Sequence, residues 1–477
     1  MQDMSSLALL TDLYQLTMAY GYWKLGIADR RAVFHLFFRR PPFGGPFAVA
    51  AGMETALAFI EKFQYRQDDL EYLAALKNEM GQPIFEPAFL EYLKGLRISC
   101  TIDAVAEGTP MFPKEPLLRV EGPLLQAQLL ESPLLNIINF QTLIATKTAR
   151  MVWAARPDPV IEFGLRRAQG VDGAISASRA AYIGGCTATS NVLAGKLYGI
   201  PVKGTHAHSW VMSFDTEEEA LRAYAEILPG LGMFLVDTYD SIAGAKKVIA
   251  LAQEKQGFDL LGVRLDSGDL TYLSIEIRRL LDAAGFTTTR IMASNELDEM
   301  LIGDLKHQGA KIDVWGVGTH LVTGKGQSAL DGVYKLSALQ DRHGVWQGKL
   351  KVSEQMAKTT IPGILQVRRF YNEKGYLADM IYDVRDSLSS SMIDPMHPTH
   401  VKETSRDFYD LLEPLMQDGK RLHATKDLGS IRSYAETQLN LFHPAMRRFF
   451  NPQPYFCGLE HTLYKRQQEI IHAMSKK

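Results

Sequence analysis

The chain has 477 residues, with 52 Lys and Arg against 54 Asp and Glu, so its formal net charge is −2. A charge this close to zero argues against a nucleic-acid-binding protein that works through overall basicity, although it still allows a local cationic pocket for a small anion. Hydrophobic residues make up 46% of the chain, as in ordinary globular proteins, and the length suffices for about three domains or for one large barrel with additions.

The three cysteines, Cys100, Cys186 and Cys457, lie far apart in the sequence and form no CxxC pair. This pattern predicts neither a disulfide framework nor a structural zinc site, and it fits a reducing cytoplasm. The apolar N-terminus lacks a basic segment and contains acidic residues, and no stretch reaches the about 18 apolar residues of a membrane span. We therefore expect a cytoplasmic protein without a signal peptide and without membrane or nucleic-acid partners.

Residues 1–130 combine helical and strand signals and are predicted to form an N-terminal mixed α/β domain. Apolar residues recur at helical spacing over 9–20, and the run AVFHLFF at 32–38 predicts a strand. A long helical pattern begins at Ser132 and Pro133, because Ser is a good N-cap and Pro is tolerated in the first turn of a helix.

From Val160 on, short apolar runs end in polar or glycine clusters and alternate with helical stretches. Seven such runs begin near residues 160, 188, 200, 232, 260, 290 and 312. Strands that alternate with helices form parallel βα units, and seven in series favour a barrel over an open sheet. The uneven intervals between the runs predict an irregular, TIM-like parallel α/β barrel over residues 131–330.

The alternation stops near residue 324, and residues 331–477 show strand–turn–strand patterns followed by helical spacing. We expect this C-terminal part to pack on the N-terminal domain. The second domain, of mixed α+β type, would then be built from both ends of the chain.

In βα barrels the reactive residues lie at the carboxyl ends of the strands, which is where the polar clusters of this chain are predicted to fall. One cluster, GVRLDSGD, contains Arg264 and Asp266, which are two residues apart and therefore share a face of the strand. The pair could bind an anion together with a sugar hydroxyl or a metal-bound water. A strand-end salt bridge followed by a turn explains the segment equally well.

Two further segments indicate anion binding. In WGVGTHLVT, Gly316 and Gly318 would let backbone amides approach a phosphate just before Thr319, with a tight barrel turn as the alternative. In FGLRRAQG, Arg166 and Arg167 would point to opposite sides of a strand, so at most one faces the pocket, and a solvated charge pair is the alternative.

The segment GTHAHSW places His206 and His208 on one face of a predicted strand. This arrangement is typical either of a metal-binding His-x-His pair or of a catalytic, nucleophilic histidine. Among the later strand ends only His320 offers another imidazole, so ligation of a metal by histidines is the weaker interpretation. The third interpretation is that these histidines belong to the core or cap a helix.

Two more polar clusters supply hydrogen-bonding groups at predicted strand ends. They are Asn295 and Glu296 of ASNELDE, and Asp237, Thr238 and Asp240 of VDTYD. Each cluster could bind a sugar or a carbonyl group, or could cap the helix that follows. Together, the strand-end clusters predict a site for a small, multiply anionic, sugar-containing ligand, with carboxylates available for Mg²⁺.

Seven motifs in this order resemble the nicotinate phosphoribosyltransferase family: LLTDLYQLTMAYGYW, FGLRRAQG, GTHAHSW, VDTYD, GVRLDSGDL, SNELDE and GVGTHLVT. The later KxxxPGILQVRR segment, with Lys358, Pro362 and Gly363, also looks like that family. The resemblance implies that nicotinate and 5-phosphoribosyl 1-pyrophosphate give nicotinate mononucleotide and pyrophosphate, coupled to ATP hydrolysis, in NAD biosynthesis and salvage. It also implies the fold of type II phosphoribosyltransferases, an irregular α/β barrel joined to a smaller mixed domain, and a homodimer.

By motif position, the resemblance implies residues that bind the substrates. Tyr14 would stack on the pyridine ring, while Thr205 and Arg264 would contact nicotinate, with the arginine matching its carboxylate. Gly318 and Thr319 would hold a phosphate of the ribosyl donor.

The resemblance also implies three residues whose charge serves the reaction. Arg167 would add an anion contact, His208 would be phosphorylated by ATP, and Asp266 would serve the ribose or Mg²⁺. We expect Mg²⁺ to arrive with the pyrophosphate substrate, and no side chain is assigned as its direct ligand.

Four alternatives stay open. The nicotinamide-specific relative has an acid directly after the Gly-Thr pair, where this chain has His206, which favours a carboxylate substrate. The quinolinate enzyme is shorter and should not need an ATP-reactive histidine. A metal-dependent barrel hydrolase and a non-catalytic binding protein on the same scaffold are the alternatives from other classes.

Overall fold

The computed structural model describes residues 7–228, 230, 232–254, 260–352 and 359–475. The chain divides into two compact units. The parallel-sheet unit comprises residues 144–328 and 427–432, and the mixed unit comprises residues 1–143, 329–426 and 433–477. Among the described helices, none combines the length and the hydropathy that a membrane-spanning segment needs.

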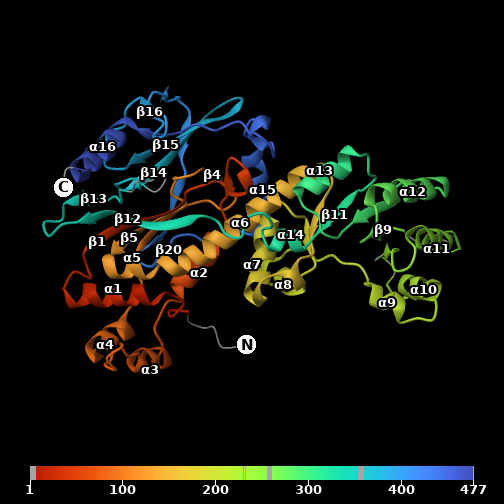
Figure 1. Ribbon diagram of the computed structural model, residues 1–477, viewed down its shortest axis with the longest axis horizontal. Coiled ribbons are helices and arrows are strands. Elements are labelled where there is room, and N and C mark those ends of the chain that lie inside the picture. Colours follow the sequence, from red (N-terminus) through yellow and green to blue (C-terminus); the bar gives the residue numbers. More distant parts are fainter. Residues whose placement is uncertain (1–6, 229, 231, 255–259, 353–358, 476–477) are drawn as a thin grey trace. The chain divides into compact units, whose positions relative to one another are not determined.

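The parallel-sheet unit is built on six strands in the order β7-β6-β11-β10-β9-β8, and all five neighbouring pairs run parallel. Two of these strands, β9 and β11, are labelled in Figure 1. The strands are β6 Val160–Glu162, β7 Ala188–Thr189, β8 Met233–Leu235, β9 Gly262–Leu265, β10 Arg290–Ala293 and β11 Val314–Val317. β6 and β11 are buried at every residue, as expected for parallel strands that are covered on both faces. The expected alternation of strands and helices is therefore confirmed.

Helices follow nearly every strand of this unit. They are α7 Gly170–Ile183, α8 Val192–Tyr198, α9 His208–Met212, α10 Glu217–Ile227, α11 Ser241–Glu254, α12 Leu270–Ala283, α13 Glu299–His307 and α14 Thr319–Val322, and the 3₁₀ turn η2 spans Leu165–Arg167. Asn191, Thr216, Asp269 and Asp298 cap α8, α10, α12 and α13 through their side-chain oxygens. The long helix α6 Glu131–Ala155 begins in the mixed unit and continues into this one.

The strand predicted near residue 200 is only partly formed. Val202 makes a single parallel bridge to Thr189, and no longer strand is described there. Pro201 has no backbone N–H to donate, which limits further pairing. In the described part of the chain, the order of the six strands thus has two ends, β7 and β8, whereas a closed barrel has none.

The mixed unit contains a seven-stranded antiparallel sheet in the order β13-β12-β1-β5-β3-β19-β20. Its strands are β1 Arg31–Phe38, β3 Thr101–Val105, β5 Leu118–Pro123, β12 Gly332–Gln340, β13 Trp346–Gly348, β19 Leu412–Gln417 and β20 Lys420–Arg421. β1 pairs with β12, and β3 pairs with β19, so strands from both ends of the chain share this sheet. The separate domain of mixed type is confirmed.

A second, six-stranded sheet of the mixed unit has the order β17-β16-β21-β15-β14-β18. Its strands are β14 Leu365–Asn372, β15 Gly375–Asp383, β16 Ser391–Ile393, β17 Val401–Glu403, β18 Phe408–Asp410 and β21 Cys457–Glu460, and a small ribbon pairs β2 Ala48–Val49 with β4 Pro110–Met111. The helices are α1 Leu13–Lys24, α2 Met53–Glu61, α3 Gln67–Ala75, α4 Pro87–Gly95, α5 Leu124–Leu129 and α16 His461–Ser475, together with α15 Leu428–Asn440, which begins in the parallel-sheet unit and continues into this one. β1 is buried over its last seven residues, which places it at the centre of the core.

Candidate active site

Arg264, near the end of β9, is held by three neighbours. Its Nη2 donates to Asp266 Oδ1 at 2.8 Å, its Nη1 donates to Thr205 Oγ1 at 2.9 Å, and its Nε donates to Ser294 Oγ at 2.8 Å. The guanidinium carbon also lies 5.5 Å from the centre of the Phe163 ring. The side chains of Arg264 and Asp266 do meet, although β9 ends at Leu265 and Asp266 lies one residue beyond it. The guanidinium has five N–H groups, and two of them have no acceptor within the described structure.

The carboxylate of Asp266 is kept charged by its surroundings. Burial by itself would raise the pKa of Asp266, but the hydrogen bond from Ser294 and the charge of Arg264 outweigh it and hold this pKa below its usual value. Ser294 therefore joins the two charged groups, because its hydroxyl accepts from the arginine and donates to the carboxylate.

A second carboxylate, Asp237, follows β8. Its Oδ2 accepts from the backbone N–H of Asp266 at 2.9 Å and from Ser267 Oγ at 2.6 Å. Its Oδ1 is buried and has no hydrogen-bond partner within the described structure. A buried carboxylate oxygen without a partner is costly, so this atom is the one best suited to a cation or to a water bound by a cation.

His208 lies at the start of α9, and its Nδ1 is 3.2 Å from Thr238 Oγ1. This contact leaves Nε2 as the ring nitrogen available to a reactant. The prediction that His206 and His208 share a strand face is wrong, because the backbone leaves the extended conformation and enters a helix between them. The period of two that places alternate residues on one face applies only within a strand.

His206 serves the sheet rather than a ligand. Its Nε2 accepts from the backbone N–H of Leu235 on β8 at 3.1 Å, and its ring lies 4.7 Å from the Tyr224 ring. Burial, the largest influence, lowers the pKa of His206 to about 4, so the imidazole is neutral at pH 7. Position 206 therefore carries a neutral side chain and not an acid. The Nε2 atom of this imidazole is already bonded to the backbone of β8.

The two arginines of FGLRRAQG, Arg166 and Arg167, are exposed and lie in η2, so the prediction that they alternate along a strand is wrong. β6 ends at Glu162, whose buried carboxylate accepts from Ser178 Oγ at 2.9 Å and from Thr189 Oγ1 at 2.6 Å. The same carboxylate accepts from the backbone N–H of residue 164 and so bends the chain into the turn.

The glycines of WGVGTHLVT are required by packing. A Cβ at Gly316 would lie 2.8 Å from the Phe163 ring, and one at Gly318 would lie 3.2 Å from the Phe163 carbonyl oxygen. Gly318 precedes the short helix α14, which begins at Thr319. The tight-turn interpretation is thus supported on geometry, and the phosphate interpretation stays a prediction for the half-buried Gly318 and Thr319.

In ASNELDE, Asn295 adopts a left-handed backbone with φ of 110°, which is rare for a residue with a side chain. Glu296 Oε2 lies 2.5 Å from His320 Nε2. Asp298 caps α13, and in VDTYD the side chain of Asp240 accepts from the N–H of Ala243 in α11. Capping therefore explains part of both clusters.

Two predicted residues do not belong to the described part of the parallel-sheet unit. Tyr14 lies on α1 in the mixed unit, with 48% of its surface exposed. Burial, followed by the charges of Glu131 and Asp12, raises the pKa of Tyr14. Lys358 lies outside the described residues.

Sequence reasoning missed two residues that the geometry brings forward, Ser294 and Glu162. Ser294 directly precedes the predicted Asn295 at the end of β10, so the strand-end rule could have found it. Glu162 is a charged residue in an apolar run, which is the signal for a buried polar role.

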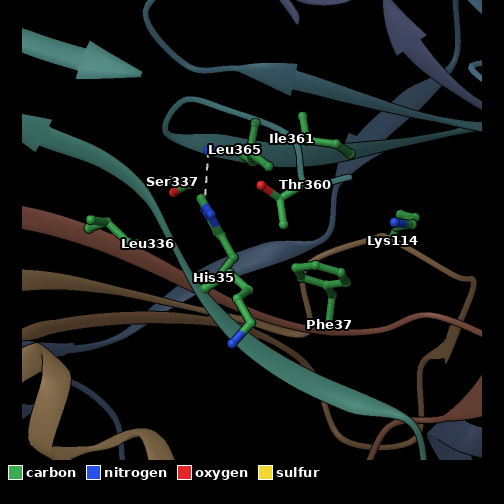
Figure 2. A pocket seen from close by; sticks show the side chains of 9 residues that line it. His35, Phe37, Lys114, Leu336, Ser337, Thr360, Ile361 and Leu365 are labelled. Carbon is green, nitrogen blue, oxygen red and sulfur yellow. Dashed lines mark hydrogen bonds between the residues drawn. The ribbon is translucent and has the colours of Figure 1, made fainter. Parts of the chain in front are cut away.

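A small pocket lies elsewhere, in the mixed unit (Figure 2). His35 reaches from β1 toward β14, and its Nε2 accepts from the N–H of Leu365 at 3.2 Å. Lys114, whose pKa is lowered to about 8 by burial and by Arg39, is among the lining residues. With a volume of about 10 Å³, the pocket has room for roughly one water molecule and is too small for a nucleotide substrate.

Comparison with known proteins now places the chain. Residues 9–139, 159–353 and 365–467 match the N-terminal domain, the family and the C-terminal domain of nicotinate phosphoribosyltransferase. A nicotinate phosphoribosyltransferase from Bacillus subtilis is 41% identical over 482 residues, which cover 99% of this chain and 96% of that protein. The chain belongs to the nicotinate phosphoribosyltransferase family. The resemblance of the seven motifs is confirmed.

Other members of the nicotinate phosphoribosyltransferase family agree. A relative with this name from Caenorhabditis elegans is 37% identical, and the match covers 97% of this chain and 93% of that protein. The crystal structure of human nicotinic acid phosphoribosyltransferase superposes with a TM-score of 0.83 at 32% identity, covering 96% of this chain and 99% of that one. A nicotinate-nucleotide pyrophosphorylase from Pyrococcus furiosus, at 22% identity and a TM-score of 0.70, shares the fold.

The histidines of this family member do not form the metal cluster of a barrel hydrolase. His206 accepts from Leu235, His208 contacts Thr238, and His320 contacts Glu296. Each imidazole thus has a different partner, and no grouping of metal-ligating side chains is found at the described strand ends.

Proposed function

We propose that this protein transfers the phosphoribosyl group of 5-phosphoribosyl 1-pyrophosphate to the ring nitrogen of nicotinate, releasing nicotinate mononucleotide and pyrophosphate, and that phosphorylation of His208 by ATP drives the reaction. Membership of the nicotinate phosphoribosyltransferase family supports the transfer itself. The observation that supports the site most strongly is the Arg264, Asp266, Thr205 and Ser294 cluster at the strand ends.

Arg264 is the group we assign to the carboxylate of nicotinate. Its two remaining N–H groups match a carboxylate fork, and its half-shielded position strengthens a charged hydrogen bond. Thr205 accepts from this arginine and donates its one hydroxyl proton to the His206 carbonyl oxygen at 3.0 Å, so we assign it to orienting the arginine beside nicotinate. Tyr14 on α1 keeps its predicted role of stacking on the pyridine ring.

The anionic donor needs further positive partners. Arg167 in the exposed turn and the backbone amides at Gly318 and Thr319 are assigned to its phosphate groups. Glu162 holds the turn that carries the arginine, because its carboxylate binds the first amide of that turn.

Mg²⁺ fits the carboxylates present. Asp237 offers the buried Oδ1 that lacks a partner, and Asp266 stays ionised beside it. Oxygen donors of this kind are those Mg²⁺ prefers, with most of its shell left to pyrophosphate and water. When bound, the ion would neutralise charge on the departing pyrophosphate.

The proposed role of His208 follows from its neighbours. Thr238 contacts Nδ1, so Nε2 attacks the γ-phosphorus of ATP, a P–N bond forms, and the bond from that phosphorus to the bridging oxygen breaks to release ADP. The added negative charge would order the segment around His208 by creating new charge-assisted hydrogen bonds. Water later cleaves the P–N bond and resets the histidine.

The test uses the full chain incubated with ATP and analysed by mass spectrometry at neutral or basic pH. We expect an acid-labile phosphate on His208, lost in His208→Asn but kept in His307→Asn, which alters an imidazole at the end of α13. Unchanged ATP stimulation of turnover in His208→Asn, with no phosphate on the wild type, would overturn the proposal.

A second test addresses substrate choice. Pyrophosphate release is measured with nicotinate, nicotinamide and quinolinate, each with and without ATP. Turnover with nicotinate that ATP stimulates is the expected result, and turnover with nicotinamide alone would contradict it.

We further infer that the parallel sheet acts as an incomplete barrel. At one end of the sheet, the bridge between Val202 and Thr189 extends it beyond β7. Four residues after Val202, the side chain of His206 accepts a hydrogen bond from Leu235 of β8, the strand at the other end. This side-chain hydrogen bond then connects the two ends where a closed barrel would have paired strands.

Homodimer assembly and a cytoplasmic location stay predictions.

A further inference from the structure

The turn between β16 and β17 gathers three side chains that commonly bind metals, Asp394, His397 and His400. One ligand atom from each lies within 4.8 Å of the other two. Among the residues that the structure describes, this is the one place where three or more such side chains converge in this way. We propose that this hairpin binds a single Zn²⁺ through the carboxylate of Asp394 and the imidazoles of His397 and His400.

The backbone of the turn sets the three side chains at every third residue. Ile393 pairs with Val401 as the last pair of the hairpin, and the N–H of Asp394 donates to the His400 carbonyl at 3.0 Å. Within the turn, the N–H of His397 donates to the Asp394 carbonyl at 3.2 Å, and that of His400 donates to the His397 carbonyl at 2.7 Å. Two successive tight turns therefore bring the side chains of Asp394, His397 and His400 close to one another.

The carboxylate is already oriented for a ligand role. Asp394 Oδ1 accepts from the N–H of Met396 at 2.8 Å, and Oδ2 lies 3.1 Å from His397 Nδ1. Around a tetrahedral zinc with bonds near 2.0 to 2.1 Å, two ligand atoms are separated by about 3.3 Å. The observed distance between these two atoms is close to that value, so a zinc ion fits between them with little movement.

The second imidazole lies nearby. The rings of His397 and His400 are stacked, with centres 5.4 Å apart and planes at 29°. Both residues are exposed, so their side chains can rotate by the small amount that closes the ligand set without disturbing packing. Pro395 and Pro398 restrict the backbone on either side of His397, which reduces the entropy lost when the ion binds.

The donor chemistry selects the ion. Two imidazoles and one carboxylate suit Zn²⁺ and the neighbouring transition metals, whereas Mg²⁺ and Ca²⁺ prefer sites made only of oxygen. The nearby cation Lys402 is engaged elsewhere, since its Nζ donates to the Leu377 carbonyl at 2.8 Å and lies 5.5 Å from the Phe456 ring centre. Three protein ligands leave a fourth position for water.

The consequence of binding belongs to the hairpin. β17 is the edge of its six-stranded sheet and pairs only with β16 in the strand order. An ion at the turn would clip these two strands together and so hold the edge in register. The three ligands share no residue with the Arg264 cluster, so this site is independent of the proposed transfer reaction.

The test uses the full chain stripped with a chelator, then dialysed against Zn²⁺ and, for spectroscopy, titrated with Co²⁺. We expect one equivalent of zinc and a visible Co²⁺ spectrum typical of nitrogen and oxygen ligands. Affinity should fall at least about tenfold in His397→Ala and in His400→Ala, because loss of a second-shell partner alone costs ten- to a hundredfold. His423→Ala, which changes another exposed histidine, should bind as the wild type does.

Two results would overturn the proposal. One is the absence of stoichiometric zinc from the wild type. The other is zinc that His208→Asn removes and His397→Ala keeps, since the ion would then sit at the strand ends. Nicotinate turnover is measured in His397→Ala alongside, and its expected persistence separates the zinc site from the transferase activity.

Discussion

Arg264, the proposed partner of the nicotinate carboxylate, illustrates how the position of one side chain depends on its neighbours. Three groups fix its guanidinium, and they come from residues 205, 266 and 294 of the chain. Ser294 stands out because it binds both members of the ion pair. At the scale of the residue, the uncharged hydroxyl of Ser294 therefore helps to fix the positions of both charged side chains.

The first prediction concerns this hydroxyl. Ser294→Ala removes the acceptor of Arg264 Nε and the donor to Asp266, and each lost hydrogen bond costs about 1 kcal/mol. Two such bonds together correspond to about 2 kcal/mol, so we expect kcat/KM for nicotinate to fall about thirtyfold. Arg264→Lys, which loses the planar fork, should lower it by about 10²–10³. Steady-state kinetics measure both. Ser176→Ala, a serine to alanine change on α7, is the control, and an equal loss there would show that the effect is general destabilisation.

At the scale of the elements, the link that we infer between the two ends of the parallel sheet includes a hydrogen bond from Leu235 to the neutral imidazole of His206. His206 accepts from Leu235 only while its Nε2 carries no proton. The pKa of His206 is about 4 in the folded protein, against a usual value near 6.5 in an unfolded chain.

A pH dependence of stability follows. Between pH 6.5 and pH 4 the unfolded chain binds the proton and the folded protein does not, so lowering the pH reduces the free energy of unfolding. The loss from this group should approach the order of 3 kcal/mol at pH 4 and grow no further below it. Urea unfolding at several pH values measures it, and His206→Asn should lack this contribution. An unchanged difference between the wild type and the variant from pH 7.5 to pH 4 would contradict it.

A pair of helix glycines offers a matched test of packing between elements. A Cβ at Gly244 in α11 would lie 2.3 Å from the Val236 carbonyl oxygen, whereas a Cβ at Gly303 in α13 would meet nothing within 4 Å. Gly244→Ala should destabilise by about 1–3 kcal/mol through overpacking, and Gly303→Ala should stabilise by about 0.5–1 kcal/mol through helix propensity. Thermal or urea unfolding checks the opposite signs, and equal signs would refute the packing argument.

For the whole molecule, the balance of 52 basic and 54 acidic residues means that anion binding is local. In the site we propose, it is concentrated in a few side chains and backbone amides at strand ends. A surface feature at this scale is the apolar side of α8, where Val192, Leu193 and Leu197 are 70%, 41% and 55% exposed. Exposed apolar residues gathered on one short helix are typical of a protein interface.

This surface leads to a prediction about assembly. If the protein is a homodimer that buries α8, Leu197→Asp should shift it toward the monomer, because a carboxylate would be buried without a partner. Analytical ultracentrifugation measures the change. Met80→Asp, at a residue that is 78% exposed in the mixed unit, is the matched control. A dimer that is equally stable in both variants would place the interface elsewhere.

The sequence by itself determined the features that depend on local periodicity. The alternation of strands and helices, the contact between Arg264 and Asp266, and the motif order that resembles the family all follow from neighbours along the chain. Such features are predictable because they depend on residue order and on the local periods of strands and helices, and not on which distant segments pack together.

Only the tertiary structure decided where strands stop and which distant groups meet. The buried carboxylate of Glu162 accepts from the N–H of residue 164, and the FGLRR segment leaves the strand there. The N–H of Leu235, 29 residues away in sequence, donates to the imidazole of His206. Ser294 reaches Asp266 across 28 residues. The physical reason is that a hydrogen bond depends on distance in space, and the chain sets that distance only when its sheets and helices have packed.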